Sequence, residues 1–134
     1  MAALDTNVLA RLIVQDDAGQ CAAARLLIGR HAALGSVLFV PVTVVLELEW
    51  VLRSRFGVGK AEVVQTLSSL LSAQELSLES EHALEVALYG YSQGSADFAD
   101  CLHVALASQA GEQPLWTFDK SAAKLSGAQL LPAF

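Results

Sequence analysis

Cysteine and basic side chains are scarce in this sequence, and each shortage excludes a kind of site. The 134 residues include 2 cysteines, and 8 Lys and Arg residues stand against 14 Asp and Glu residues. Cys21 and Cys101 share no close spacing, so we expect reduced, partly buried thiols rather than disulfides or zinc ligands. The net charge of −6 argues against a polyanionic ligand unless cations assist, because Lys and Arg normally attract phosphate backbones.

Long apolar runs and a secretory leader are also missing. The longest apolar run, residues 37–46, is broken by Pro41 and ends at Glu47, well short of the roughly 20 residues that a membrane-spanning helix needs. The first residues lack a basic stretch followed by an apolar one, which is the pattern of a signal peptide. We therefore expect a soluble, cytoplasmic protein with no membrane partner.

The length and composition predict one domain over residues 1–134 with apolar groups to spare. A chain of this size normally forms a single core. The composition is 54% apolar and 16% charged, which is more apolar than a small globular domain needs for itself. We expect part of the excess to cover a partner.

Hydrophobic periodicity predicts strands that alternate with helices along the whole chain. The expected strands are 2–4, 37–40, 75–78, 115–118 and 129–131. The expected helices are 8–13, 16–30, 43–56, 61–71, 80–92 and 97–109, followed by a helical turn at 121–125. Strands that are apolar on both faces and alternate with helices indicate an α/β protein whose parallel sheet is covered on two sides.

Acidic residues follow the first and fourth of these strands. Asp5 and Asp119 should emerge at the carboxyl ends of parallel strands, where such sheets bind ligands. Each could instead cap the helix that follows it, and for a lone Asp at a helix start capping is the commoner role. Asp97 and Asp100 lie at another helix start and share one face, so they could serve as a cap and a first-turn acid or could hold a metal.

Two glutamates on the helix expected at 43–56 are predicted to differ in their exposure to solvent. Glu49 precedes Arg53 by four residues, which is the favourable order for a helical ion pair, so we expect a solvated surface acid. Glu47 borders the apolar stripe and has no cation among its three- and four-residue neighbours. A partly buried carboxylate of this kind needs a counter-charge.

The carboxylates at positions 5, 47, 100 and 119 would repel one another strongly if they met. At about 5.5 Å and an effective dielectric constant of about 20, each pair costs roughly 3 kcal/mol. Several pairs would rival the stability of a domain, so such a site must hold protons or cations. Oxygen ligands favour Mg²⁺ or Mn²⁺, and carboxylates with such ions hydrolyse phosphodiesters.

The sequence words around these acids resemble a known family. "LDTNVLARL" at 4–12, "VLELEWVL" at 45–52, "DFADCLHVALA" at 97–107 and "TFDK" at 117–120 are together similar to the PIN domain, particularly to the VapC-type toxins of toxin–antitoxin pairs. The resemblance spans nearly the whole chain. It implies a three-layer α/β/α fold with a central parallel sheet ringed by helices, and Mg²⁺- or Mn²⁺-dependent cleavage of RNA.

The resemblance also implies roles for individual residues. The family's acidic cluster corresponds to Asp5, Glu47, Asp100 and Asp119, with Asp97 as an accessory metal ligand. The family's polar residues near the metal correspond to Thr6, Asn7 and Thr117. Which acid accepts the proton of the attacking water stays open.

Further partners follow from charge, from the apolar excess and from the resemblance. Arg11 lies four residues after Asn7 on one helical face and could contact RNA, as could Arg53, Arg55 and Lys60, although solvated surface positions are the default for such residues. We expect a homodimer and an antitoxin protein that covers the active site. Two alternatives are a PIN-like module without catalysis and a haloacid-dehalogenase-like phosphatase, whose general acid would fall at Asn7 and is therefore missing.

Overall fold

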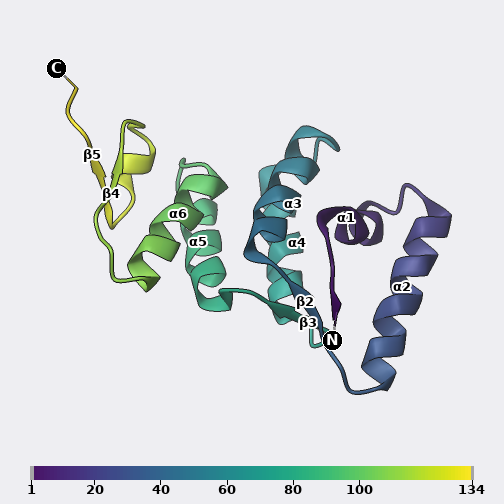
Figure 1. The fold of residues 1–134 in the computed structure, drawn as a ribbon. Coiled ribbons are helices and arrows are strands. Elements are labelled where there is room, and N and C mark those ends of the chain that lie inside the picture. Colours follow the sequence, from purple (N-terminus) through teal and green to yellow (C-terminus); the bar gives the residue numbers. More distant parts are fainter. Residues whose placement is uncertain (1, 134) are drawn as a thin grey trace. The chain divides into compact units, whose positions relative to one another are not determined.

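The computed structural model describes residues 2–133 of the chain (Figure 1). These residues divide into two compact units, one that runs up to Glu79 and one that begins at Ser80. Each unit has its own helices, strands and buried side chains, and each is described by itself below.

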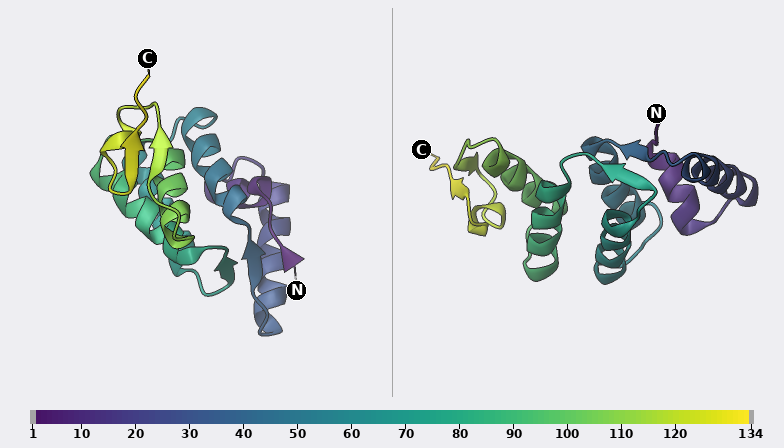
Figure 2. Two further views of the ribbon diagram at one scale, coloured as in Figure 1. Left: turned by 60° about the vertical axis from the view of Figure 1, so that its left-hand side comes forward. Right: turned by 90° about the horizontal axis from the view of Figure 1, so that it is seen from below.

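The first unit is built from three short parallel strands and four helices. Its elements in chain order are β1 (Ala2–Ala3), α1 (Thr6–Val14), α2 (Ala18–Ala33), β2 (Leu38–Val40), α3 (Val42–Ser54), α4 (Lys60–Ser72) and β3 (Leu76–Leu78). The strands form a parallel sheet in the order β1-β2-β3, with Ala2 opposite Leu38 and Leu38 opposite Leu76. Figure 2 shows this sheet from two further directions.

Local chemistry explains where the first two helices begin and end. The carboxylates of Asp5 and Asp17 accept hydrogen bonds from the backbone N–H groups of the first turns of α1 and α2, which compensates N–H groups that a helix start leaves unpaired. Gln15 ends α1 in the left-handed region, with φ 59°. Helix α3 begins directly after Pro41, because proline is well suited to a helix start and poorly suited to its interior.

The core of the first unit lies where its helices meet the central strand. Helix α1 packs against α2 and α3, and α3 packs against α4. The fully buried side chains here are Leu9, Leu38, Val40, Leu48, Leu52 and Val63. Strand β2 supplies two of them and is hydrogen-bonded on both sides, so the sheet and the helices share one apolar interior.

The second unit pairs two helices and two parallel strands. It contains α5 (Glu81–Gln93), α6 (Phe98–Gln109), β4 (Leu115–Thr117), the 3₁₀ helix η1 (Ala122–Lys124) and β5 (Ala128–Leu130). Strands β4 and β5 pair in parallel, with Trp116 opposite Gln129. Helices α5 and α6 pack against each other, and the rings of Tyr91 and Phe98 meet edge to face at 5.5 Å, a favoured arrangement for aromatic pairs.

Each predicted strand and helix is present within a few residues of its expected bounds. All strand pairs are parallel and the helices alternate with them, which confirms the α/β class. Cys21 and Cys101 are buried thiols, as expected from their spacing. No helix among the described residues is long and apolar enough to cross a membrane.

Candidate metal-binding site

The first predicted acid, Asp5, lies in the turn between β1 and α1. The Val8 N–H donates to its Oδ1 at 3.2 Å, so the capping interpretation of Asp5 is confirmed. The turn is fixed from below by Leu4, which is 2% exposed and whose N–H donates to the carbonyl of Phe39 at 2.9 Å. Asp5 itself is exposed, and the cap engages Oδ1 of its two carboxylate oxygens. Capping therefore does not prevent Asp5 from binding a cation.

A hydrogen bond from Thr6 brings Glu47 to the start of α1. Thr6 is 5% exposed, and its hydroxyl donates to Oε1 of Glu47, which lies 41 residues further along the chain. Because Thr6 directly follows Asp5, this contact places two of the four predicted acids at one end of the first unit. A hydroxyl donor of this kind orients a carboxylate ligand.

The predicted surroundings of the two glutamates on α3 were wrong. Glu49 is 3% exposed and Glu47 is exposed, whereas the sequence predicted a solvated Glu49 and a partly buried Glu47. The expected ion pair is present, with Arg53 Nε 2.8 Å from Glu49 Oε2. Helix α3 packs against both α1 and α4, so its covered surface is wider than a single apolar stripe and includes Glu49.

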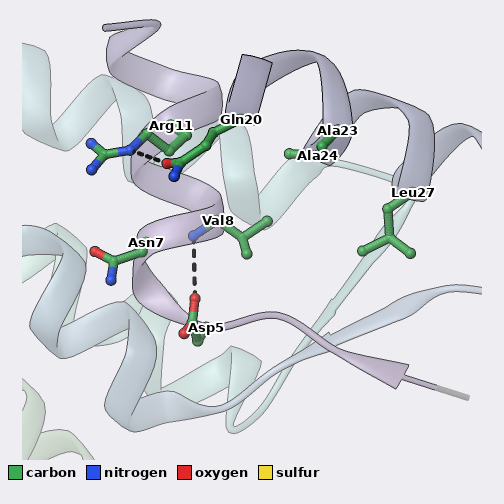
Figure 3. Close-up of a pocket in the computed structure, with 8 residues that line it drawn as sticks. All are labelled: Asp5, Asn7, Val8, Arg11, Gln20, Ala23, Ala24 and Leu27. Atoms are coloured by element: carbon green, nitrogen blue, oxygen red, sulfur yellow. Dashed lines mark hydrogen bonds between the residues drawn. The ribbon is translucent and has the colours of Figure 1, made fainter. Parts of the chain in front are cut away.

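An open groove begins beside Asp5 and runs between α1 and α2 (Figure 3). Its volume is about 380 Å³. Asn7 and Arg11 line it from α1. The Arg11 guanidinium donates to Gln20 Oε1 at 2.7 Å and lies 3.1 Å from Asp16 Oδ1, so this cation is already paired on its own unit.

In the second unit, Asp97 and Asp100 occupy the start of α6. Asp97 is at the N-cap position, where its side chain makes no capping hydrogen bond, and Asp100 follows in the first turn. Burial raises the pKa of Asp100, the nearby carboxylates of Asp119 and Asp97 raise it further, and His103 opposes them. These acids are close enough for their negative charges to repel one another, and a bound cation would relieve that repulsion.

Asp119 lies just beyond β4 and is held by its neighbours. Its Oδ1 accepts from the Ala122 N–H at 3.0 Å and so caps η1. Its own N–H donates to Thr117 Oγ1 at 3.0 Å, which gives Thr117 a definite role in shaping the turn. The capping interpretation is thus confirmed for Asp119 as well as for Asp5.

Within each unit, the structure brings some of the predicted acids together. Asp5 and Glu47 belong to the first unit, and Asp97, Asp100 and Asp119 belong to the second. Within residues 2–133, no three His, Cys, Asp or Glu side chains form a group that could hold a metal ion. The complete set of four acids therefore stays a prediction.

One contact near this site could not be read from the sequence. Gln20 contacts Arg11 although the two residues lie on different helices, nine positions apart, and no local pattern signals such a pair. Arg53 is paired with Glu49, while Arg55 and Lys60 are exposed. An RNA-binding role for these basic residues remains a prediction.

Comparison with known proteins identifies the family. The family model described as the PIN domain matches residues 2–128. No curated protein and no solved structure matches the chain. The match, together with parallel strands that alternate with helices, confirms the expected α/β/α fold class. It covers both compact units and all the predicted acids, so the chain belongs to the PIN domain family, whose members are generally nucleases.

Proposed function

We propose that this protein is an endoribonuclease that depends on Mg²⁺, or on Mn²⁺ in its place, and acts as the toxin of a toxin–antitoxin pair. The family supports a nuclease. The choice of RNA and of a toxin role rests on the resemblance of the four sequence words to VapC-type toxins.

One observation supports the site above all others, namely the bond from Thr6 to Glu47. It joins the start of α1 to α3 across 41 residues and places Glu47 beside the residue that follows Asp5. A buried hydroxyl that donates a hydrogen bond to an exposed carboxylate fixes the direction of that carboxylate.

The donor chemistry fits a hard divalent cation. Asp5, Glu47, Asp100 and Asp119 would hold it, with Asp97 as an accessory ligand, and all of these offer carboxylate oxygens. When bound, the cation would supply Lewis-acid polarisation of the phosphate and would offset charge on the leaving oxygen. Thr6 would keep Glu47 oriented, and Thr117 would hold the turn that carries Asp119.

A bound cation would also offset the repulsion between this acidic protein and the phosphates of RNA. The chain carries a net charge of −6 and would repel RNA, and Arg11 and Arg53 are each engaged with an acid. Divalent ions at the carboxylates would invert the local charge where a phosphate must approach. Both the binding of RNA and its cleavage should therefore depend on the metal.

The decisive experiment is a cleavage assay on total RNA and on single-stranded oligonucleotides. We expect cleavage with Mg²⁺, none in EDTA, and none by Asp5→Asn. Asp17→Asn is the matched control, because Asp17 is also an exposed helix-capping aspartate but lies outside the proposed site. Equal activity of the two variants would contradict the assignment of Asp5, and binding of RNA without cleavage by the wild type would favour a non-catalytic PIN module.

The proposal extends to an antitoxin partner. An antitoxin arginine that reaches the carboxylates would pair with them in bidentate fashion and compete with the metal. Inhibition should then weaken as Mg²⁺ is raised. An antitoxin that inhibits equally at low and high Mg²⁺ would argue against this mode of inhibition.

We further propose a homodimer. Trp50 is 58% exposed on α3, and an exposed tryptophan is more typical of an interface than of a free surface. Val51, the next residue on α3, is 8% exposed and belongs to the core. Sedimentation at micromolar concentration should give a dimer for the wild type and a shift towards monomer for Trp50→Glu, and a monomeric wild type would end the proposal.

A further inference from the structure

The groove beside Asp5 has two kinds of wall. Small and aliphatic side chains line it from α2, among them Ala23, Ala24 and Leu27. Asp5 and Asn7 stand at one end and the Arg11–Gln20 pair at the other (Figure 3). Its volume of about 380 Å³ falls in the range of roughly 300–1,000 Å³ typical of small-ligand sites.

The Arg11–Gln20 contact determines which polar group faces a ligand. Arg11 Nε donates to Gln20 Oε1 at 2.7 Å, which turns the amide oxygen towards Arg11 and the amide nitrogen away from it. The amide nitrogen of Gln20 then offers N–H donors, and the Arg11 guanidinium offers only donors. This end of the groove therefore favours ligands with hydrogen-bond acceptors.

We propose that this groove is a base-binding subsite of the nuclease, which receives one nucleobase of single-stranded RNA next to the cleaved phosphate and prefers a base with a carbonyl group. The inference rests on the proposed function for the identity of the substrate. A base is flat and apolar on its faces and polar at its edge, which matches alanine walls with donors at the end.

The position of Asp5 supports a base rather than an unrelated small molecule. Asp5 lines the groove and is also a proposed metal ligand, so a phosphate held by the metal would place its own nucleoside at the mouth of the groove. Adenine is disfavoured, because it has no carbonyl oxygen and because an amide whose oxygen is turned towards Arg11 cannot present its oxygen and nitrogen together to adenine. Guanine, uracil and cytosine carry carbonyl oxygens that the Gln20 amide nitrogen can bind.

A filled groove tests the site directly. Ala23→Phe introduces a ring into the groove, and Ala22→Phe is the matched control, because Ala22 is equally exposed on α2 and does not line the groove. Binding of labelled RNA oligonucleotides is measured by fluorescence anisotropy with Ca²⁺ in place of Mg²⁺, because Ca²⁺ takes the same oxygen ligands without the strict octahedral geometry of Mg²⁺, and the RNA is checked to be intact. One abasic nucleotide is placed at each position of the RNA in turn.

The proposal expects one abasic position that weakens binding about tenfold in the wild type and in its Ala22→Phe derivative, a change of about 1.4 kcal/mol. In the Ala23→Phe derivative that position should have no effect beyond the loss already caused by the substitution. The same abasic profile in all three proteins would overturn the proposal and would leave the groove to a peptide partner.

The Gln20 amide is tested by Gln20→Glu. The carboxylate still accepts from Arg11 but cannot donate, so the preference for a carbonyl base at the sensitive position should disappear while the bond to Arg11 is kept. An unchanged base preference would overturn the role of Gln20. Because these measurements read binding, a protein that binds in this manner but never cleaves would contradict the proposed function and leave the groove assignment standing.

Discussion

Glu47 and Glu49 lie two residues apart on α3 but have opposite surroundings. Glu47 is exposed and accepts from a buried hydroxyl, whereas Glu49 is 3% exposed and lies 2.8 Å from the guanidinium of Arg53. A buried carboxylate is expensive to desolvate and depends on its partner. The same side chain is thus open to a ligand at one position and held by a partner inside the protein at the other.

Substitution by glutamine should separate these two roles. Glu47→Gln should abolish RNA cleavage and change the free energy of unfolding little, because its carboxylate is exposed. Glu49→Gln should cost about 1–2 kcal/mol, since it weakens a charge-assisted hydrogen bond whose carboxylate is buried, and it should retain full activity per folded molecule. Urea unfolding and a cleavage assay on both variants would measure this, and an inactive but stable Glu49→Gln would reverse the assignment.

Asp100 makes the metal-free fold sensitive to pH. Burial and the carboxylates of Asp119 and Asp97 raise its pKa, so the folded state holds this proton more tightly than the unfolded chain does. The ionised carboxylate therefore lowers the free energy of unfolding when the pH is above the raised pKa. This loss of stability disappears as the pH falls through that pKa. The acid therefore destabilises the folded protein at neutral pH when no cation is bound.

Asp100→Asn should consequently be more stable than the wild type at pH 7 in EDTA. The difference should shrink as the pH is lowered towards the ordinary pKa of aspartate, about 3.9. Saturating Mg²⁺ should reverse the order at pH 7, because only the wild type offers the carboxylate. Urea unfolding at several pH values measures the effect, and a variant that is less stable in EDTA would show that repulsion at Asp100 is unimportant.

Capping side chains at the helix starts contribute to the stability of single helices. The carboxylate of Asp17 accepts from the Gln20 N–H at 3.0 Å and caps α2, the helix that forms one wall of the groove. Asp17→Ala should cost about 1 kcal/mol in the free energy of unfolding. Asp16→Ala removes the same charge from an exposed pair with Arg11 and should cost less, since surface pairs contribute roughly 0–1 kcal/mol. Equal losses would indicate that charge and not capping is responsible.

Local patterns were sufficient to place the elements. The residues at 8, 9, 12 and 13 repeat at helical spacing and lie in α1, and the apolar residues before Pro41 form β2. Such features depend on neighbours within about four positions. The same holds for the caps at Asp5 and Asp119, each of which reaches three residues ahead.

Contacts between distant segments could not be predicted in the same way. The burial of Glu49 depends on how α1 and α4 cover α3, and the partner of Thr6 lies 41 residues away. Neither contact produces a recognisable sequence pattern within a few residues of either position. Local sequence patterns therefore predict helices, strands and caps, but not which distant side chains touch.

For the whole molecule, the proposed cation should act as a stabilising ligand. A ligand that binds only the folded state adds about 2.7 kcal/mol when present at 100 times its dissociation constant. Mg²⁺ or Mn²⁺ should therefore raise the Tm of the wild type by several degrees, and EDTA should remove the gain.

The variant Asp5→Asn provides the comparison in that experiment. It keeps an oxygen that can accept from Val8, so its fold should persist, but it loses a charged ligand and should respond less to the cation. A wild-type Tm that does not move with millimolar divalent ions would be strong evidence against the metal site.

The helix caps at Asp5 and Asp119 have a consequence for how this protein would lose activity under selection. Each cap engages Oδ1, and asparagine also presents an oxygen there, so exchange of Asp for Asn removes charge without removing the cap. Under the proposed toxin function, asparagine variants that arise at these positions should be inactive but folded proteins that still bind the antitoxin, whereas alanine variants should also lose about 1 kcal/mol of stability with each cap.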